Sequence, residues 1–413
     1  MLVPLAVRML GAAATGAVVM ALVQPAPAAK APDAKAAALP EVFKNGEGGF
    51  VVDHIAYALS KDASETGACP KGMTGGLPGL TKAIETTPEG KQRPGESTEA
   101  WKQRLAAKVS TLPDGKYVCA NPELSAPDPT FRTVTGANVP ADGIDLDGQD
   151  SRPGKRPAPG TCAHADFPGL NGERGIDNQF YRVVGCSKSW QSTGQSNGYE
   201  IEMYTGSWGI VLQLKGVDNL QNDNDVEVGI YSNGDPIQLS STRQALAYAT
   251  YAVDQDPRFR ATAHGRIVNG VLTTDPVDVR FHMIVNSIRL ERPIKGARVK
   301  LTIAPDGAMD GYLAGYTPVE EMYDLQYGFR NGKDGKGGPA NPRLRKISSE
   351  GQAFVLGHTC NGAYYALKAA ADGMRDPATG HCTAISTQYR IHMIPAFVVD
   401  LPTQSINARL DGK

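Results

Sequence analysis

Apolar and polar residues alternate over much of the middle of the chain. The clearest runs cover 198–204, 209–215, 225–231, 277–285 and 298–303. A period of two turns one set of side chains toward a core and the other toward solvent, which is the pattern of a half-buried β-strand. Asn, Asp and Gly residues separate the runs, and this spacing predicts an antiparallel β-sandwich or jelly roll. Shorter runs at 388–392 and 395–400 predict closing strands.

Helical spacing of apolar residues appears on both sides of this β-region. It predicts helices at 51–59, 99–109 and 361–372, and a short helix that follows Pro318 and runs to about Leu325. Ser97 or Thr98 is the expected N-cap of the second helix. Asn361 is the expected N-cap of the third, with Gly373 as its stop.

Together these elements predict a mainly β protein with added helices, an α+β fold. The expected order is a signal peptide at 1–28, a helical or irregular N-terminal region at 29–125, a proline-rich acidic linker at 126–165 and a β-sandwich-like domain at 166–413. The last region contains a basic loop at 328–346 and the helix at 361–372, which two cysteines bracket. The prolines between 121 and 165 make this stretch the best candidate for a boundary.

The first residues carry the pattern of an export signal. Arg8 is followed by an apolar stretch at 9–23 and by the small-residue sequence Ala26-Pro27-Ala28, where we expect cleavage. The alternative is an uncleaved anchor, but a stretch of about fifteen residues is short for a membrane span. No later segment has the apolar length of a span, so we expect a periplasmic or secreted protein with no span in the mature chain.

Six cysteines agree with an oxidising compartment, and none forms a Cys-x-x-Cys pair. Fifteen pairings are possible for six cysteines. Their order along the chain suggests Cys69–Cys119, Cys162–Cys186 and Cys360–Cys382. The alternative is that some are free, buried thiols.

Basic and acidic residues nearly balance, with 42 Lys and Arg against 43 Asp and Glu and a formal net charge of −1. This balance gives no global attraction to nucleic acid or to anionic lipid, and we expect no nucleic-acid partner. The chain also lacks a phosphate-binding loop, a His-Glu-x-x-His pair and a Gly-x-Ser-x-Gly elbow. The sequence therefore supports none of the enzyme classes that those motifs mark.

An acidic run at 142–150 is the most chemically loaded segment. Asp145, Asp147 and Asp150 could direct several oxygens at one centre, which is what Ca²⁺ requires. The run resembles the Asp-x-Asp-Gly-x-Asp loops of several extracellular calcium modules. It departs from an EF-hand, because the sixth and twelfth positions counted from Asp145 are Asp150 and Arg156 instead of Gly and Glu. The alternative is a solvated acidic loop with Asx-turns.

A second acidic segment, at 218–225, lies between two predicted strands. Its candidate calcium ligands are Asp218, Asp223 and Asp225. The same residues are typical of an ordinary turn between strands, so this alternative stays open.

Carboxyl groups also gather at 162–179. Asp166, Glu173 and Asp177 are candidates for a general acid–base pair, as glycosidases use. The alternative is that they satisfy backbone groups in a tight loop. Three histidines, His358, His381 and His392, could form a metal or acid–base cluster, although separate histidines are the better interpretation.

The loop at 328–346 is rich in glycine and basic residues. Its candidate ligand-binding side chains are Arg330, Lys333, Lys336, Arg343 and Arg345. A flexible basic loop can close over an anionic group such as a uronate, sulfate or phosphate. The alternative is a solvated loop with no ligand.

These features favour a binding protein over an enzyme, without deciding between them. The leading hypothesis is an exported protein that binds a saccharide, an envelope polymer or another surface ligand, with Ca²⁺ as a candidate stabilising ion. The first alternative is a secreted polysaccharide hydrolase or lyase that uses the loop carboxylates. The second is a structural component of the envelope.

Overall fold

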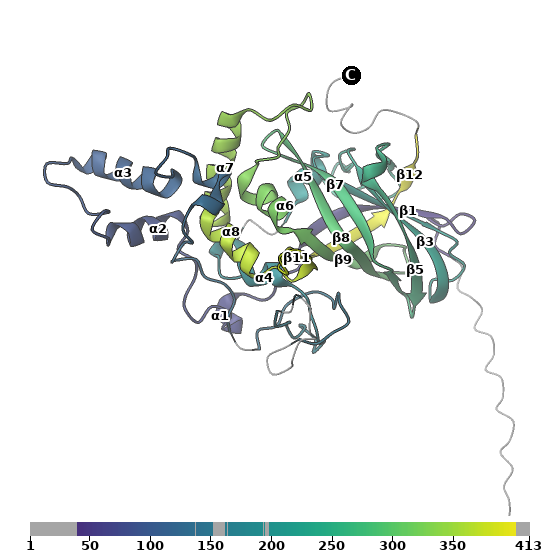
Figure 1. The fold of residues 1–413 in the computed structure, drawn as a ribbon. Helices are drawn as coiled ribbons and strands as arrows, with labels where there is room; N and C mark the ends of the chain where they lie inside the picture. The colour runs from purple at the N-terminus through teal and green to yellow at the C-terminus, as the bar shows by residue number, and fades with distance from the viewer. Residues whose placement is uncertain are drawn as a thin grey trace, which may run out of the picture. The chain divides into compact units, whose positions relative to one another are not determined.

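Antiparallel strand pairing organises the computed structural model, which describes residues 39–136, 138–151, 162, 164–192, 194 and 198–401 (Figure 1). The main sheet runs in the order β1 (Gly48–Tyr57), β2 (Gly209–Lys215), β3 (Asn222–Asn233), β5 (Arg260–Val268), β6 (Val271–Thr274), β8 (Ile288–Ile303), β9 (Met309–Pro318), β11 (Cys382–Pro395) and β10 (Gly373–Arg375). Strand β1 also pairs with β11, so the strands from β1 to β11 close into a cycle. The predicted α+β class is confirmed.

Three further strands complete the β-structure of the described residues. Strand β7 (Val277–Val285) pairs with the first half of β8, where the two form a hairpin. Strands β4 (Thr250–Ala252) and β12 (Phe397–Val399) form a small parallel pair. Residues of this hairpin form one wall of a charged cavity described below.

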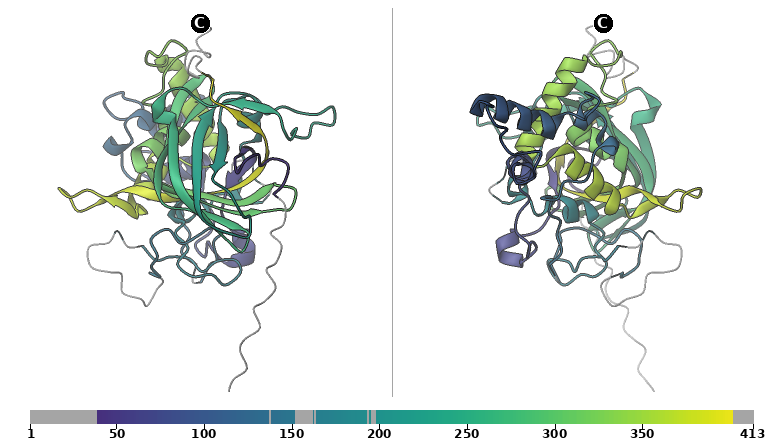
Figure 2. Two further views of the ribbon diagram at one scale, coloured as in Figure 1. Left: turned by 90° about the vertical axis from the view of Figure 1, so that its right-hand side faces the viewer. Right: turned by 60° about the vertical axis from the view of Figure 1, so that its left-hand side comes forward.

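Helices pack at one side of the sheet. The described α-helices are α1 (Ala63–Thr66), α2 (Gly76–Glu85), α3 (Thr98–Ser110), α4 (Gln179–Val184), α5 (Glu200–Tyr204), α6 (Val319–Tyr323), α7 (Pro342–Leu356) and α8 (Cys360–Ala369). Short 3₁₀ turns are η1 (Val118–Ala120), η2 (Pro122–Leu124), η3 (Lys188–Trp190) and η4 (Pro257–Phe259), and η5 (Asp324–Gly328) is a π-helix. Figures 1 and 2 show α6, α7 and α8 close together, with α2 and α3 beyond α7.

The helix predicted at 51–59 is wrong, because these residues belong to strand β1. The cause is a β-bulge between Val52 and His54, which shifts the register against β11. A bulge breaks the alternation of buried and exposed side chains, so the apolar spacing imitates that of a helix. The strand that the N-terminal region contributes therefore lies between β2 and β11 of the main sheet.

Other element predictions differ in detail. The run at 198–204 forms the short helix α5 instead of a strand. The predicted cap Ser97 is confirmed, since its side chain accepts a hydrogen bond from the Ala100 amide. Helix α8 begins one residue earlier than expected, and its cap is Thr359 instead of Asn361. Part of the expected basic loop is helical, because α7 begins at Pro342.

The predicted disulfide pairing is wrong, although all six cysteines are paired. The bonds join Cys69 to Cys186, Cys119 to Cys360 and Cys162 to Cys382. Their sequence separations are 117, 241 and 220 residues. Pairing of β1 with β11 and packing of α8 against η1 and η2 bring segments that are distant in the sequence together, so long-range disulfides form in place of local ones.

The predicted signal peptide at 1–28 lies outside the described residues. Within the described residues, no helix combines the length and the apolar character needed to cross a bilayer.

Candidate functional site

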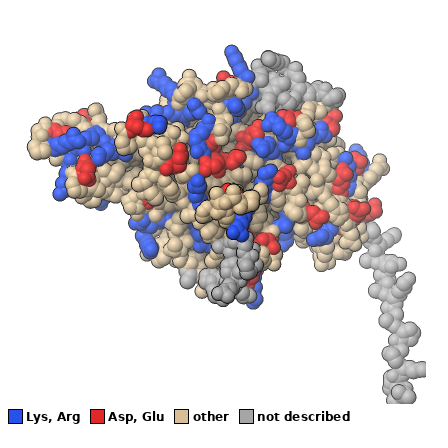
Figure 3. Space-filling view, viewed as in Figure 1, with Lys and Arg blue, Asp and Glu red and all other residues tan. Residues whose placement is uncertain are grey.

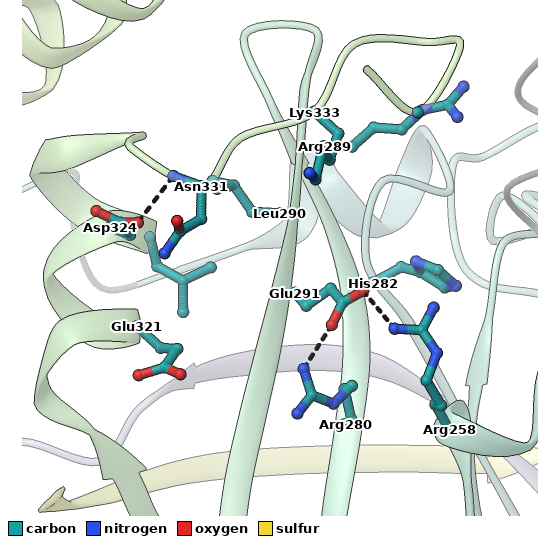
Figure 4. Close-up of a pocket in the computed structure, with 12 residues that line it drawn as sticks. Arg258, Arg280, His282, Arg289, Leu290, Glu291, Glu321, Asp324, Asn331 and Lys333 are labelled. Carbon is teal, nitrogen blue, oxygen red and sulfur yellow. Dashed lines mark hydrogen bonds and ion pairs between the residues drawn. The ribbon is translucent and has the colours of Figure 1, made fainter. Parts of the chain in front are cut away.

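A charged cavity of about 490 Å³ lies between the β7–β8 hairpin and the segment that follows β9 (Figure 4). Its polar lining consists of Arg258, Arg280, His282, Arg289, Glu291, Glu321, Asp324, Asn331 and Lys333. We call this space the hairpin cavity. Its size is within the range of sites that hold small ligands.

The wall formed by the hairpin follows from strand pairing. On β7, Arg280 and His282 are two residues apart and so share a face, and Glu291 on β8 is directly opposite His282. The Glu291 carboxylate accepts hydrogen bonds from Arg280 Nη1 at 2.5 Å and from Arg258 Nη1 at 3.0 Å (Figure 4). Arg258 is also paired with Asp256 at 2.8 Å. One carboxylate thus orients two guanidinium groups at the cavity wall.

His282 supports this wall from behind. Its Nε2 lies 2.6 Å from Oδ2 of the buried Asp254, and its ring stacks on Phe259 with 3.6 Å between centroids. The imidazole side chain is only 9% exposed. The carboxylate and the aromatic ring therefore hold the histidine in one orientation, which also steadies the neighbouring strand.

The opposite wall is the π-helix η5, which ends at Phe329 in the left-handed region with φ 52°. Single π-turns occur often at functional sites. Asp324, buried in η5, accepts hydrogen bonds from Arg330 Nε at 2.5 Å and from the Asn331 amide at 3.0 Å. Arg330 also pairs with Glu320 at 2.7 Å. Arg330 is thus bonded to these two carboxylates, and it does not line the hairpin cavity.

Lys333 closes the cavity from the loop. Its backbone pairs with that of Arg289 through N–H···O distances of 2.9 and 2.8 Å, which ties the loop to the start of β8. Lys333 is exposed, and among the described residues no ion pair neutralises its ammonium group. Figure 4 shows it beside Arg289, above Glu291. Four cationic side chains and three acidic ones thus line the cavity, and two of those acids are already bonded to arginines.

The remaining residues of the predicted basic loop point elsewhere. Lys336 is exposed, and Arg343 is exposed on α7. Arg345 donates from Nη1 to the Arg330 carbonyl at 2.8 Å and is half-buried. Of the five predicted residues, only Lys333 lines the hairpin cavity.

A second candidate site is a group of three carboxylates. Oxygen atoms of Asp145, Asp147 and Asp177 all lie within 4.8 Å of one another, and within the described part of the chain this is the one group of its kind. Asp177 Oδ2 accepts from the Leu146 amide at 2.6 Å. Burial raises the pKa of Asp177 to about 9, and the charges of Asp147 and Asp166 add to this effect. Hard carboxylate oxygens gathered in this way are ligands that Ca²⁺ prefers.

The predicted metal and catalytic residues therefore converge in an unexpected combination. Asp177, expected as an acid–base candidate, joins Asp145 and Asp147, whereas Asp150 is not in the group. Asp166 accepts from the Ser151 amide at 2.6 Å, and burial raises its pKa. Glu173 is exposed and accepts from the Asn171 amide at 2.9 Å.

The acidic segment at 218–225 leads into strand β3, which begins at Asn222. Asp223 accepts from the amides of Asp218 at 2.8 Å and Asp225 at 3.1 Å. These are the Asx-turn contacts of the alternative interpretation. None of the three belongs to the carboxylate group found among the described residues.

The three histidines considered as a cluster have separate surroundings. His358 is buried and contacts the Tyr327 hydroxyl through Nδ1 at 2.7 Å. His392 contacts Asp53 through Nδ1 at 2.6 Å. His381 lines a cavity beside the Cys162–Cys382 disulfide.

Sequence reasoning missed the three arginines of the hairpin cavity. Arg280 and His282 occupy alternate positions of a strand that was correctly predicted, so a polar face was visible there. Arg258 and Arg289 come from η4 and from the start of β8, and no pattern links them before the chain is folded. Comparison with known protein families, curated proteins and solved structures found no match.

Proposed function

We propose that the chain is an exported, disulfide-stabilised binding protein that holds an anionic saccharide or envelope polymer in the hairpin cavity. The observation that carries the proposal is the pair Arg258 and Arg280, oriented by one shared carboxylate, with Lys333 above them. Guanidinium groups match the geometry of carboxylate, sulfate and phosphate, and a fixed orientation lowers the entropy lost on binding. A uronate or a sulfated sugar suits this arrangement.

Export rests on two observations that support each other. The segment 1–28 has the pattern of a signal peptide. Three disulfides join distant parts of the chain, and disulfides persist in oxidising compartments such as the periplasm or the extracellular space.

Calcium is proposed as a stabilising ion at Asp145, Asp147 and Asp177. The three side chains offer oxygen ligands on a pliable loop. A bound cation would favour the ionised form of Asp177, whose pKa burial otherwise raises to about 9. Its role would be to hold the 142–151 loop against the segment that contains Asp177.

A polysaccharide hydrolase or lyase is the second candidate function. The same raised pKa favours it, because a carboxyl group that stays protonated near neutral pH can serve as a general acid. The effect of calcium distinguishes the two proposed roles of Asp177, calcium ligand and general acid. If calcium raises the stability of the fold, Asp177 acts as a ligand. If the protein hydrolyses a polysaccharide and calcium inhibits this activity, Asp177 acts as the acid.

The binding proposal is tested by calorimetric titration of the purified mature protein. The probes are oligogalacturonate, a sulfated oligosaccharide and a neutral oligosaccharide of similar length. Lys333→Gln and Arg280→Gln should each weaken binding of an anionic probe by about tenfold, equivalent to about 1.4 kcal/mol. Lys336→Gln is the matched control, since it removes the same charge from the same loop outside the cavity lining.

Raising the salt concentration should weaken anionic binding further, because exposed charge pairs are screened. The proposal fails if neutral and anionic probes bind equally. It also fails if Lys333→Gln and Lys336→Gln behave alike.

A further inference from the structure

Helix α7 carries an exposed apolar stripe. Phe354 is 72% exposed, Ile347 55%, Val355 49% and Leu344 37%. Positions three, seven, ten and eleven residues apart fall on one side of a helix, and Gly351 lies between the two halves of the stripe with open space around it. The stripe therefore runs the length of the helix.

The buried face of α7 is unusually poor in large apolar side chains. Its buried residues are Ser348, Ser349, Ala353 and Leu356. Ser349 donates to the Arg345 carbonyl at 2.9 Å. A helix that packs only on its own protein normally shows the reverse arrangement, with large apolar residues inward and polar residues outward. Contiguous exposed apolar side chains of this kind mark a binding surface.

Basic residues accompany the stripe. Arg343 and Lys346 lie on α7 itself, and Lys336 lies in the loop before it. Neither Arg343 nor Lys336 has an ion pair among the described residues. Lys346 approaches Glu350 at 3.9 Å, and its ammonium group lies 5.3 Å from the centroid of the Tyr117 ring. Glu350 is the acid on this flank of the helix. Figure 3 shows Lys and Arg side chains over the start of α7 and the preceding loop.

We propose that the α7 surface, defined by Leu344, Ile347, Phe354 and Val355 with Arg343, Lys346 and Lys336, docks on a membrane that contains anionic lipids. The apolar stripe enters the boundary between headgroups and acyl chains, and the basic side chains meet the lipid phosphates. Helix α7 then lies in the plane of the interface.

Charge favours a lipid surface over a second copy of the chain. A two-fold contact pairs each residue of one copy with a different residue of the other, and α7 offers the single acid Glu350 against the bases Arg343, Arg345 and Lys346. Two copies joined through the stripe would therefore bring an excess of positive charge together. An anionic bilayer supplies both the apolar layer and the opposite charge. The formal net charge of −1 gives no global attraction, so the effect depends on this local surface.

Vesicle co-sedimentation tests the proposal with the purified mature chain. The wild type should bind vesicles of phosphatidylcholine with phosphatidylglycerol far more than vesicles of phosphatidylcholine alone. The double variant Ile347→Ser/Phe354→Ser should reduce binding by about tenfold or more. Ile201→Ser is the matched control, because Ile201 is 74% exposed on a different helix. Thermal unfolding should be unchanged in all these variants, since the altered side chains are exposed.

Two further measurements separate lipid binding from other occupants. Arg343→Gln/Lys346→Gln should remove the preference for anionic vesicles, and hydrogen exchange should slow over 342–356 when vesicles are present. Lys333→Gln should leave vesicle binding unchanged, so this proposal and the cavity proposal can fail separately. Equal binding to neutral vesicles overturns the membrane proposal. The membrane proposal is also overturned if light scattering shows that the wild type is a dimer and that Phe354→Ser dissociates it. In that case a second copy of the chain covers the α7 surface.

Discussion

The guanidinium carbon of Arg292 lies 4.4 Å from the centroid of the Trp208 ring, and both side chains are fully buried. Arg292 donates from Nη1 to the hydroxyls of Tyr57 at 3.0 Å and Tyr389 at 2.5 Å. Among the described residues no carboxylate is bonded to it, and its Nε has no partner. The aromatic faces and hydroxyl oxygens therefore hold a buried cation, and the Glu202 carboxylate is near enough to interact with its charge without bonding to it.

This arrangement predicts strong coupling between Arg292 and Tyr389. Tyr389→Phe removes a hydroxyl that accepts from a buried charge and should cost about 1–3 kcal/mol of unfolding free energy. In the Arg292→Met background the same change should cost much less, because the group that needs the acceptor is gone. Urea denaturation of the four proteins of this cycle gives the coupling energy. A coupling near zero would mean that the hydroxyl does not support the cation.

The disulfide between Cys119 and Cys360 joins η1 to the start of α8 across a separation of 241 residues. Closing so long a loop restricts the unfolded chain, and the chain-entropy model gives about 5–6 kcal/mol for it. Cys119→Ser/Cys360→Ser should therefore lower the melting temperature by several degrees or more. Peptide mapping of the unreduced wild type should find Cys119 linked to Cys360, and a Cys69–Cys119 peptide would contradict the structure.

The buried imidazole of His358 should make the folding stability of the protein depend on pH. Burial lowers the pKa of His358 to about 3, below its ordinary value of 6.5. Between these two values the imidazole is protonated in the unfolded chain and neutral in the folded chain. The unfolding free energy therefore decreases as pH falls from about 6.5 toward 3. Tyr327→Phe/His358→Phe removes both the base and its partner hydroxyl and should flatten that part of the stability curve relative to Tyr327→Phe alone. Parallel curves for the two variants would exclude this role.

The fold class was predictable because alternation survives in parts of strands such as β3 at 225–228 and β8 at 298–302, where one face is buried. The strand β1 was not predictable, since a single bulge between Val52 and His54 gives it helical spacing. The order of the cysteines along the chain also failed to predict the disulfides, because their partners lie 117 to 241 residues apart and meet only in the folded chain.

The candidate sites show the same division between local and long-range information. The acidic run at 142–150 was visible as a possible ligand set, but its third carboxylate is Asp177, which only folding brings near. Lys333 was visible as a basic loop residue, whereas its neighbours Arg258 and Arg280 come from separate elements that share Glu291. Residue types could be predicted, and their combination could not.

The raised pKa of Asp177 gives the calcium proposal a definite pH signature. The folded-state pKa is about 9 against an ordinary value of 3.8, mainly because of burial. Between about pH 4 and pH 9 the folded protein holds a proton that the unfolded chain has lost, so stability without calcium should fall as pH rises through this window. Calcium should reduce that fall, because the ion favours the ionised carboxylate. Thermal unfolding with calcium and with chelator at several pH values measures both effects.

Asp177→Asn separates the charge of this residue from its hydrogen bond. The amide oxygen can still accept from the Leu146 amide, while the buried charge disappears. The variant should be more stable than the wild type in chelator at pH 8, should lose the pH dependence and should no longer respond to calcium. Asp223→Asn is the control, since Asp223 lies at the start of β3 outside the carboxylate group and should leave the calcium response intact. Identical melting curves with calcium and with chelator for the wild type would refute the calcium site.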